Sequence, residues 1–333
     1  MISLNDRTPE AASSSAAERG SVKSGISVVV PVYNSQDSLP LLVGRLGPVL
    51  ASCSAKFEAI LVDDCSRDKS WDVILELSRE HEWMRGIRLM RNYGQHNALL
   101  CGIRAARFDI AVSLDDDLQN PPEEIPRILE RLREGFDVVY GRPNQERHGL
   151  LRDLASTLTK VALRSAMGAE TARSVSAYRA FRTQLRDAFV NYRGPYVSID
   201  VLLTWATTRF SSVTVRHDQR LIGRSGYSLG KLIRHAMNMM TGFSTFPLQV
   251  ASIIGFAFTV FGAGVLGFVL WRYFAAGSTV AGFPFLASVI AIFSGAQLFA
   301  LGIIGEYLAR MHFRTMDRPP YAVRNYVGRG EPL

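Results

Sequence analysis

Short runs of apolar residues alternate with amphipathic segments over residues 26–140. The runs are nearly continuous in Val, Ile and Leu, which is typical of strands in a sheet that is covered on both faces. They occupy residues 26–32, 57–62, 86–90, 110–114 and 136–140. Segments with helical spacing lie between them, and this alternation predicts an α/β domain built on a mostly parallel, doubly wound sheet.

The amphipathic segments include recognisable helix boundaries. Residues 68–81 have helical spacing, and residues 121–135 begin with Pro-Pro-Glu-Glu and end at a glycine. Proline and acidic residues favour the first turn of a helix, and glycine favours its end. Farther along, residues 150–167 and 228–241 mix apolar and basic positions, which predicts amphipathic helices at a membrane surface, and residues 213–215 predict a further strand.

Two segments near the C-terminus, residues 248–271 and 283–304, contain no charged residue. Each is long enough to cross a hydrocarbon core of about 30 Å. A pair of buried core helices is the alternative, and two long uncharged segments in series argue against it. The flanks are basic and the connection at 275–282 is uncharged, so the pattern predicts a hairpin with both ends in the cytosol. The flanking basic residues are Arg216, Arg220, Arg224, Lys231 and Arg234 before the hairpin, and Arg310, Arg314 and Arg318 after it.

The composition, with 47% hydrophobic and 20% charged residues, excludes a disordered chain. A formal charge of +8 favours anionic partners. Much of this excess flanks the apolar segments, and no basic and aromatic patch of an RNA-binding module is present, so we expect anionic membrane lipids and no nucleic acid as partners.

Residues 1–24 lack an apolar run, which predicts a flexible tail without a secretory signal. Cys53, Cys65 and Cys101 lack the spacing of a zinc or redox motif and predict reduced thiols.

Three consecutive aspartates, Asp115, Asp116 and Asp117, lie between a predicted strand and a predicted helix. In extended chain Asp115 and Asp117 point to one side and Asp116 to the other. Ligands of open α/β sheets bind at the C-terminal ends of the strands, and carboxylates there suit Mg²⁺ or Mn²⁺ with a substrate diphosphate. A solvated acidic turn is the alternative, since Asp-rich turns are common.

A second acidic turn, with Asp63 and Asp64, follows the second predicted strand and therefore lies at the same edge of the sheet. One of these carboxylates is suited to accept hydrogen bonds from a base or a ribose, whereas Asp68 is suited to cap the next helix. The chain has no GxGxxG after its first strand, no P-loop, no HExxH and no nucleophile elbow. These absences point away from dehydrogenases and ATPases, and favour a diphosphate bound through a metal and carboxylates.

Together these features resemble the family 2 glycosyltransferases of the GT-A fold. The resemblance is to their polyprenol-phosphate branch, which includes dolichol-phosphate mannose synthase-like and undecaprenyl-phosphate 4-deoxy-4-formamido-L-arabinose transferase-like enzymes. The matching motifs are VVVPVYN at 28–34, VDDCSRDKS at 62–70, RNYGQHNA at 91–98, DDDLQNPPEEIP at 115–126, the stretch 217–227, and GIIGEYLAR at 302–310, which ends the apolar pair. The resemblance covers residues 27–321.

The resemblance implies an inverting transfer of a sugar from a nucleotide-diphosphate donor to a polyprenyl phosphate, of the undecaprenyl or decaprenyl type, at the cytoplasmic membrane face. A lipid phosphate is already an anionic nucleophile, so positioning and leaving-group stabilisation dominate over general base catalysis. The implied cofactor is Mg²⁺ or Mn²⁺, held by Asp115, Asp117 and Gln119. Relatives also imply a homo-oligomer packed through the membrane region.

The same resemblance implies roles for individual residues. Those implied around the nucleotide-sugar are Pro31, Tyr33, Asn34, Asp63, Asp64, Gly94, Gln95 and Asp116. Those implied at the acceptor phosphate are Arg142, Arg152, Arg179, Arg220 and Ser225, and the catalytic set is Asp115, Asp117 and Arg142. Arginine suits phosphate because its planar guanidinium binds two oxygens at once. Contacts with solvent or lipid headgroups are the alternative for each arginine.

Three positions depart from the family pattern. Asp116 stands where a small residue is common, Ser35 where Glu is frequent, and Gly226 where Asn or Lys is common. Because of these departures, the resemblance does not identify the sugar or the nucleotide, although it does indicate the class of enzyme. The alternative functions are a transferase of the same fold that acts on another membrane glycolipid or polysaccharide, and a non-catalytic scaffold that binds nucleotide-sugar. A processive synthase needs a QxxRW-like motif, and the dipeptide Arg-Trp does not occur here.

The expected organisation follows from these patterns. It comprises a tail (1–24), a GT-A domain (25–227), a juxtamembrane amphipathic helix (228–246), two transmembrane helices within 247–309 (248–272 and 283–305) and a cytoplasmic C-terminal tail (310–333).

Overall fold

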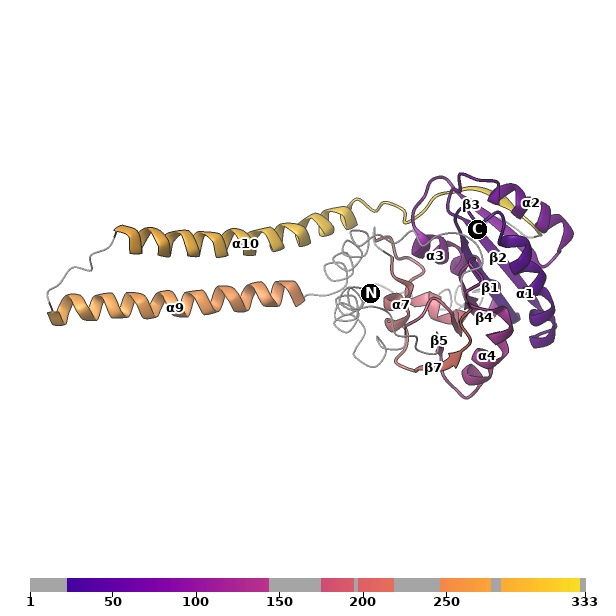
Figure 1. Cartoon of the computed structure of the whole chain (residues 1–333), viewed down its shortest axis with the longest axis horizontal. Coiled ribbons are helices and arrows are strands. Elements are labelled where there is room, and N and C mark those ends of the chain that lie inside the picture. Colours follow the sequence, from indigo (N-terminus) through magenta and orange to yellow (C-terminus); the bar gives the residue numbers. More distant parts are fainter. Residues whose placement is uncertain (1–22, 144–174, 195–196, 219–245, 277–282, 330–333) are drawn as a thin grey trace, which may run out of the picture.

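The structure is a computed structural model that describes residues 23–143, 175–194, 197–218, 246–276 and 283–329. Within these ranges, a domain with a central sheet is joined to two long helices that project from it side by side (Figure 1). The predicted N-terminal tail lies almost entirely outside the described residues, as do the predicted amphipathic helices at 150–167 and 228–241.

The described strands form one sheet in the order β7-β5-β6-β4-β1-β2-β3-β8. They are β1 (Lys23–Val32), β2 (Phe57–Asp63), β3 (Met84–Leu89), β4 (Phe108–Ser113), β5 (Val138–Pro143), β6 (Arg179–Arg182), β7 (Phe210–Val215) and β8 (Val323–Val327). Neighbouring strands pair in parallel except where β6 or β8 takes part. The mostly parallel α/β sheet predicted from the alternating pattern is confirmed.

Helices cover both faces of the sheet and enclose two apolar cores. The helices of the domain are α1 (Leu39–Cys53), α2 (Ser70–Glu80), α3 (Gln95–Ala105), η1 (Pro122–Glu124), α4 (Ile125–Arg133), η2 (Thr183–Ala188) and α7 (Ile199–Thr204). One core contains the apolar faces of α1, α2 and α4, including Leu46, Ile74 and Ile128. The other contains α3, η2 and α7, including Leu100 and Leu202. Burial on both faces explains why the central strands are almost continuously apolar.

The two antiparallel strands, β6 and β8, were not predicted. Both are short, and β8 alternates apolar and polar residues only weakly. The pairing of β8 with β3 brings the chain that leaves the second long helix back to the edge of the sheet. Tyr321, just before β8, packs under the guanidinium of Arg104 on α3, with 5.6 Å between the guanidinium carbon and the ring centre.

The two long helices are α9 (Phe246–Ala276) and α10 (Phe283–Thr315), and they contain the two predicted uncharged segments. Each is long and apolar enough to cross a bilayer. Large apolar side chains along them are exposed, for example Phe256 at 72% and Phe274 at 81%. A core helix of a soluble domain would bury these side chains, so the chain is a membrane protein. The helices pack on each other through an edge-to-face contact of Phe258 and Phe293, with 5.6 Å between the ring centres.

Candidate active site

The loops after β1, β2 and β4 lie at one edge of the sheet, because these strands run parallel and are adjacent. The residues predicted to bind the nucleotide-sugar and the metal lie at the ends of these strands, in the loops that follow them, or at the start of α3, which follows β3. In open α/β sheets this edge is where ligands bind. The topology therefore brings together motifs that are up to about ninety residues apart in the sequence, from 28–34 to 115–126.

The three aspartates occupy a turn, and not the extended chain that was expected. β4 ends at Ser113, and Leu118 takes a left-handed conformation with a φ of 62°. The continued strand assumed for these residues is therefore absent, and the alternation of faces among Asp115, Asp116 and Asp117 stays a prediction. Hydrogen bonds to neighbouring loops orient these side chains instead. We call residues 114–120 the acidic loop.

Two different loops hold the acidic loop. The Gln95 amide, in the first turn of α3, donates to Asp115 Oδ1 at 2.6 Å. On the other side, Asp116 Oδ2 accepts the backbone N–H of Tyr33 at 3.3 Å and the hydroxyl of Ser35. Two of the departures from the family pattern, Ser35 and Asp116, are thus hydrogen-bond partners. Asp116 ties the acidic loop to the end of β1, which the sequence alone did not indicate.

The acidic loop concentrates negative charge in a partly desolvated place. Burial raises the pKa of Asp115 to about 7, and the charges of Asp117 and Asp116 add to this, whereas Arg179 and Gln95 oppose it. Burial also raises the pKa of Asp116 to about 6, against the hydrogen bonds from Ser35 and Tyr33. Carboxylates that repel one another in this way are stabilised by a nearby cation.

The donor set fits a divalent cation that shares its ligands with a substrate. Within the described ranges, no three His, Cys, Asp or Glu side chains converge as a complete metal site. Mg²⁺ commonly binds through one or two carboxylates together with substrate phosphates and water, and Asp115 and Asp117 provide two. Asp117 Oδ1 accepts the backbone N–H of Gln119 at 3.1 Å, and a metal contact of the Gln119 side chain stays a prediction.

The second acidic turn supports the site from β2 and β3. Asp63, fully buried, accepts the Ser66 N–H at 2.9 Å, and its other oxygen lies 3.2 Å from Arg88 Nε. Asp64 accepts two backbone N–H groups, from Tyr93 and Gly94, both at 2.7 Å. Gly94 has a φ of 94° and precedes α3, so Asp64 positions the turn that presents Gln95 to the acidic loop. A contact of Asp63 or Asp64 with the nucleoside stays a prediction.

Asp64 provides a pH-dependent test of this arrangement. Burial raises its pKa to about 6 from an ordinary value of 3.8, so the folded protein binds this proton more tightly than the unfolded chain does. The free energy of unfolding should therefore decrease as the pH rises from about 4 to 6, by on the order of 2 kcal/mol from this group. The Asp64→Asn variant lacks this component. Thermal unfolding across this pH range should show a shallower decrease for the variant, and equal slopes would contradict the assignment.

Hydrogen bonds join the loop after β1 to the turn after β2. Pro31 is buried in β1, whereas the ring of Tyr33 is exposed just beyond it. Asn34 has a φ of 56° and accepts the Arg67 N–H on its side-chain oxygen at 2.8 Å. Asp68 accepts the N–H of Ser70, the first residue of α2, at 3.0 Å, but the N-cap position belongs to Lys69, so the predicted capping role of Asp68 is wrong by one residue. These contacts leave the Tyr33 ring accessible at the site edge.

The predicted acceptor arginines have different surroundings. Arg142 is half-buried near the end of β5, opposite Thr214 of β7. Arg179 on β6 is only 2% exposed and pairs with Asp200 of α7. Arg152, Arg220 and Ser225 lie outside the described residues. The Asp218 N–H donates to the Gln119 carbonyl at 2.9 Å, so the chain just before position 220 borders the acidic loop.

Sequence reasoning missed Asp200 and Tyr140, which surround Arg179. The Tyr140 hydroxyl donates to Asp200 Oδ1 at 3.0 Å. Asp200 lies in a six-residue helix and follows no recognised motif, so no signal in the sequence singled it out. Asp200 is linked to the site through Arg179, whose strand β6 pairs with β4 at Ser113.

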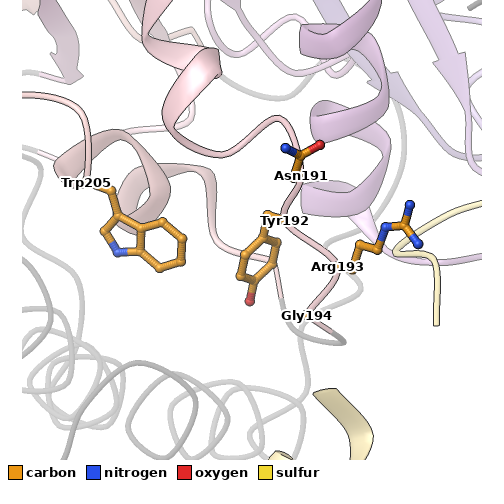
Figure 2. A pocket seen from close by; sticks show the side chains of 5 residues that line it. All are labelled: Asn191, Tyr192, Arg193, Gly194 and Trp205. Atoms are coloured by element: carbon orange, nitrogen blue, oxygen red, sulfur yellow. The ribbon is translucent and has the colours of Figure 1, made fainter. Parts of the chain in front are cut away.

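A separate cavity of about 260 Å³ lies between the loop that follows η2 and the end of α7 (Figure 2). It is lined by Asn191, Tyr192, Arg193, Gly194 and Trp205. Arg193 also pairs with Asp317, just after α10, at 2.6 Å. None of the predicted site residues lines this cavity, and the acidic loop remains the candidate site.

Comparison with known proteins gives a consistent result. The family model "Glycosyl transferase family 2" matches residues 27–189. Undecaprenyl-phosphate 4-deoxy-4-formamido-L-arabinose transferase of Photorhabdus laumondii is 35% identical over 306 residues, which covers 91% of this chain and 94% of the relative. The protein of that name from Yersinia enterocolitica has the same identity and coverage. Among solved structures, glucosyl-3-phosphoglycerate synthase of Mycobacterium tuberculosis with Mn²⁺, UDP and phosphoglyceric acid is 18% identical, with a TM-score of 0.48, and the match covers 66% of this chain and 76% of that chain.

Proposed function

The chain belongs to glycosyl transferase family 2, and on that premise we propose that it transfers a glycosyl group, with inversion, from a nucleotide-diphosphate sugar to a polyprenyl phosphate. The similarity to relatives named as undecaprenyl-phosphate sugar transferases carries this proposal. It covers 91% of the chain and therefore extends beyond the sheet domain into the apolar helices. The acidic loop at the ligand-binding edge of the sheet supports it independently.

The chemistry requires positioning more than proton transfer. An oxygen of the lipid phosphate forms a bond to the anomeric carbon while the bond from that carbon to the donor diphosphate breaks, and attack from the opposite face inverts the configuration. A divalent cation bound at Asp115 and Asp117 would supply stabilisation of the negative charge on the leaving diphosphate. Gln95 orients Asp115, and the backbone of Gln119 orients Asp117. The exposed ring of Tyr33, beside this loop, is placed to contact the nucleoside.

The connectivity supports a site beside the cytoplasmic membrane face. β7 precedes α9 and β8 follows α10, and both strands belong to the same sheet. Both ends of the hairpin therefore adjoin one domain, which favours a double-pass arrangement with the catalytic domain and both termini in the cytosol. The basic residues flanking the hairpin favour the same orientation. Membrane lipids and a second copy of the chain are the expected partners in the bilayer.

Metal removal tests the proposal and separates it from a non-catalytic scaffold. Membranes that contain the protein should transfer label from a nucleotide-sugar to added polyprenyl phosphate, and EDTA should abolish this transfer. Mn²⁺ or Mg²⁺ in excess should restore it, because the cation offsets charge that the carboxylates alone cannot neutralise. Transfer that persists in EDTA would show that the reaction does not depend on a divalent cation. A glycolipid acceptor that works as well as polyprenyl phosphate would favour the alternative acceptor class.

Of the two described arginines predicted at the acceptor phosphate, Arg142 is half-buried, whereas Arg179 is buried in an ion pair. Replacement of Arg142 by alanine should raise the KM for polyprenyl phosphate about tenfold to a hundredfold, the loss expected for one charge-assisted hydrogen-bonding partner. The KM for the donor should change little. Arg133→Ala, at an exposed position on α4, is the matched control. An unchanged acceptor KM in the Arg142 variant would remove this residue from the site.

A further inference from the structure

A buried charged group lies next to the acidic loop and has no role in the transfer described above. Arg179 on β6 pairs with Asp200 of α7, and the Tyr140 hydroxyl of β5 donates to the same carboxylate oxygen at 3.0 Å. Arg179 is 2% exposed, Asp200 5% and Tyr140 not at all. Placing two ionised groups in a protein interior costs several kcal/mol each before their attraction is counted. The presence of a buried ion pair is therefore weak evidence that it stabilises the fold. We ask instead whether this pair serves the neighbouring site.

The sheet register places this group beside the acidic loop. Arg179 pairs across β4 and β6 with Ser113, two residues before Asp115, and across β5 and β6 with Tyr140. The Ser113 hydroxyl donates to the Ala177 carbonyl at 3.1 Å, which adds a side-chain contact to the pairing of β4 with β6. The acidic loop begins at residue 114, directly after Ser113, so Arg179 on β6 lies beside the start of this loop.

We propose that Asp200 is a positioning residue that holds Arg179 as a neutralised cation beneath the acidic loop, and thereby sets the affinity of Asp115 and Asp117 for a divalent cation. With Asp200 in place, the pair adds no net charge next to the metal ligands. Without it, Arg179 carries an uncompensated positive charge beside the strand that leads into the acidic loop. This inference rests on the proposed metal-dependent transfer, and gives Arg179 a role that differs from the predicted acceptor contact.

Two other roles for Asp200 make different predictions. A general base would need access to the acceptor, and its replacement would lower turnover without weakening cation binding. A purely structural ion pair would lower thermal stability only. The chain offers a matched control for the second case, because Glu58 and Arg85 form another buried pair, with 3.0 Å between them. This control pair lies on β2 and β3, away from the acidic loop.

The test measures Mn²⁺ affinity by electron paramagnetic resonance on the full-length protein in nanodiscs, without substrates. Asp200→Asn should weaken Mn²⁺ binding by about tenfold, because an uncompensated unit charge acts on a divalent ion at an effective dielectric constant near 20. Asp200→Glu and Tyr140→Phe keep the charge and should stay within about twofold. Glu58→Gln should lower the unfolding temperature with unchanged affinity. Should Asp200→Asn not fold, Arg179→Gln provides a second arm, in which removal of the cation should leave Mn²⁺ binding unchanged or tighter.

Each result decides the proposal. Unchanged Mn²⁺ affinity in Asp200→Asn overturns it, whether turnover is lost, as for a base, or only stability, as for a structural pair. Weaker binding in Arg179→Gln overturns it as well. A wild-type protein that binds Mn²⁺ but forms no lipid product would refute the proposed transfer and leave this inference standing, so the two failures are distinguishable.

Discussion

Replacement of Asp117 by alanine is expected to reduce sugar transfer at least about a thousandfold, the scale on which enzymes lose rate when charge stabilisation of a leaving group is removed. Asp117 is one of the two carboxylates available to a divalent cation in the acidic loop, and it also orients the loop through the Gln119 N–H at 3.1 Å. Loss of this carboxylate removes a cation ligand next to the leaving diphosphate. Initial rates with saturating nucleotide-sugar and polyprenyl phosphate measure the effect.

The same variant should still insert into the membrane, because α9 and α10 are distant in sequence from the acidic loop. Asp37→Ala is a matched control, since this aspartate is exposed near the end of β1. It should retain transfer within about twofold, as surface substitutions commonly do. Transfer by Asp117→Ala at a rate within tenfold of the wild type would show that the acidic loop is not the metal site.

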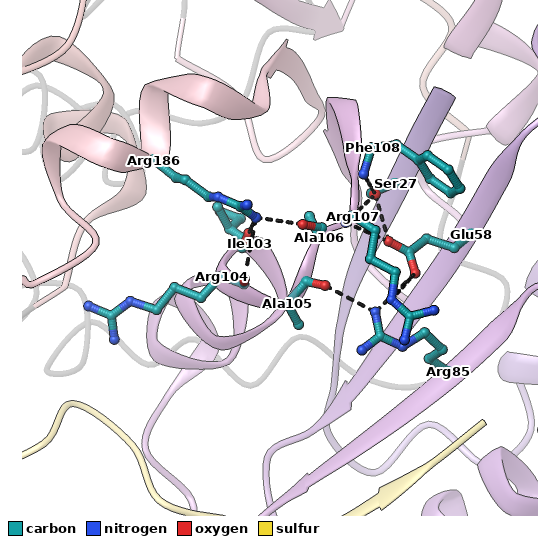
Figure 3. A network of polar contacts seen from close by, with 10 residues as sticks. All are labelled: Ser27, Glu58, Arg85, Ile103, Arg104, Ala105, Ala106, Arg107, Phe108 and Arg186. Carbon is teal, nitrogen blue, oxygen red and sulfur yellow. Dashed lines mark hydrogen bonds and ion pairs between the residues drawn. The ribbon is translucent and has the colours of Figure 1, made fainter. Parts of the chain in front are cut away.

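Replacement of Glu58 by alanine is expected to have the largest effect on stability, about 3–5 kcal/mol, the typical result of removing one partner of a buried charge pair. Figure 3 shows the network around this side chain, where strands β2 and β3 meet the end of α3. Glu58 is 4% exposed and accepts hydrogen bonds from the Ser27 hydroxyl at 2.8 Å and the Arg107 N–H at 2.8 Å, besides its pairing with Arg85. Its loss would leave the Arg85 guanidinium buried without its carboxylate.

The network also holds the C-terminal end of α3. Arg85 donates to the Ala105 carbonyl at 3.0 Å, and Arg186 donates to the Ala106 carbonyl (Figure 3). These carbonyls lie at the C-terminal end of α3, so Glu58 supports the last turn of this helix through Arg85. Thermal unfolding in detergent, followed by tryptophan fluorescence, measures the change. Glu130→Ala, an exposed glutamate on α4, should shift the unfolding temperature little, and an equal shift in both variants would contradict the expectation.

Apolar continuity was enough to predict the parallel strands, because burial on both faces leaves little choice of residue. The strands β1, β2 and β4 overlap the runs at 26–32, 57–62 and 110–114. The two long apolar helices were equally evident, since residues 248–271 and 283–304 contain no charge over a length that could cross a bilayer. The strands β6 and β8 were not predicted from the sequence, because their pairing partners are far away in the chain. Their short segments form strands only by pairing with the neighbouring strands of the folded sheet.

The candidate site also has features that the sequence predicts and features that only the fold reveals. The acidic loop was predictable from its composition and its place after a strand, whereas the orientation of its side chains was not. The extended backbone assumed for Asp115 and Asp117 is not observed, because the strand ends at Ser113. The partners that orient the loop, such as Gln95 and Ser35, come from segments that only the fold brings near. Asp200 belongs to this second class, since its importance depends on Arg179 and on the register of β6.

The proposed product is a sugar joined to a lipid phosphate. Membranes containing the protein should be incubated with a panel of radiolabelled nucleotide-sugars and polyprenyl phosphate, and the extracted lipid then exposed to mild acid or mild base. We expect one nucleotide-sugar to yield labelled lipid that mild acid releases and mild base leaves intact, as expected for a glycosyl phosphate. Label that appears only in an acid-stable glycolipid, or no lipid label from any donor, would contradict the proposed product.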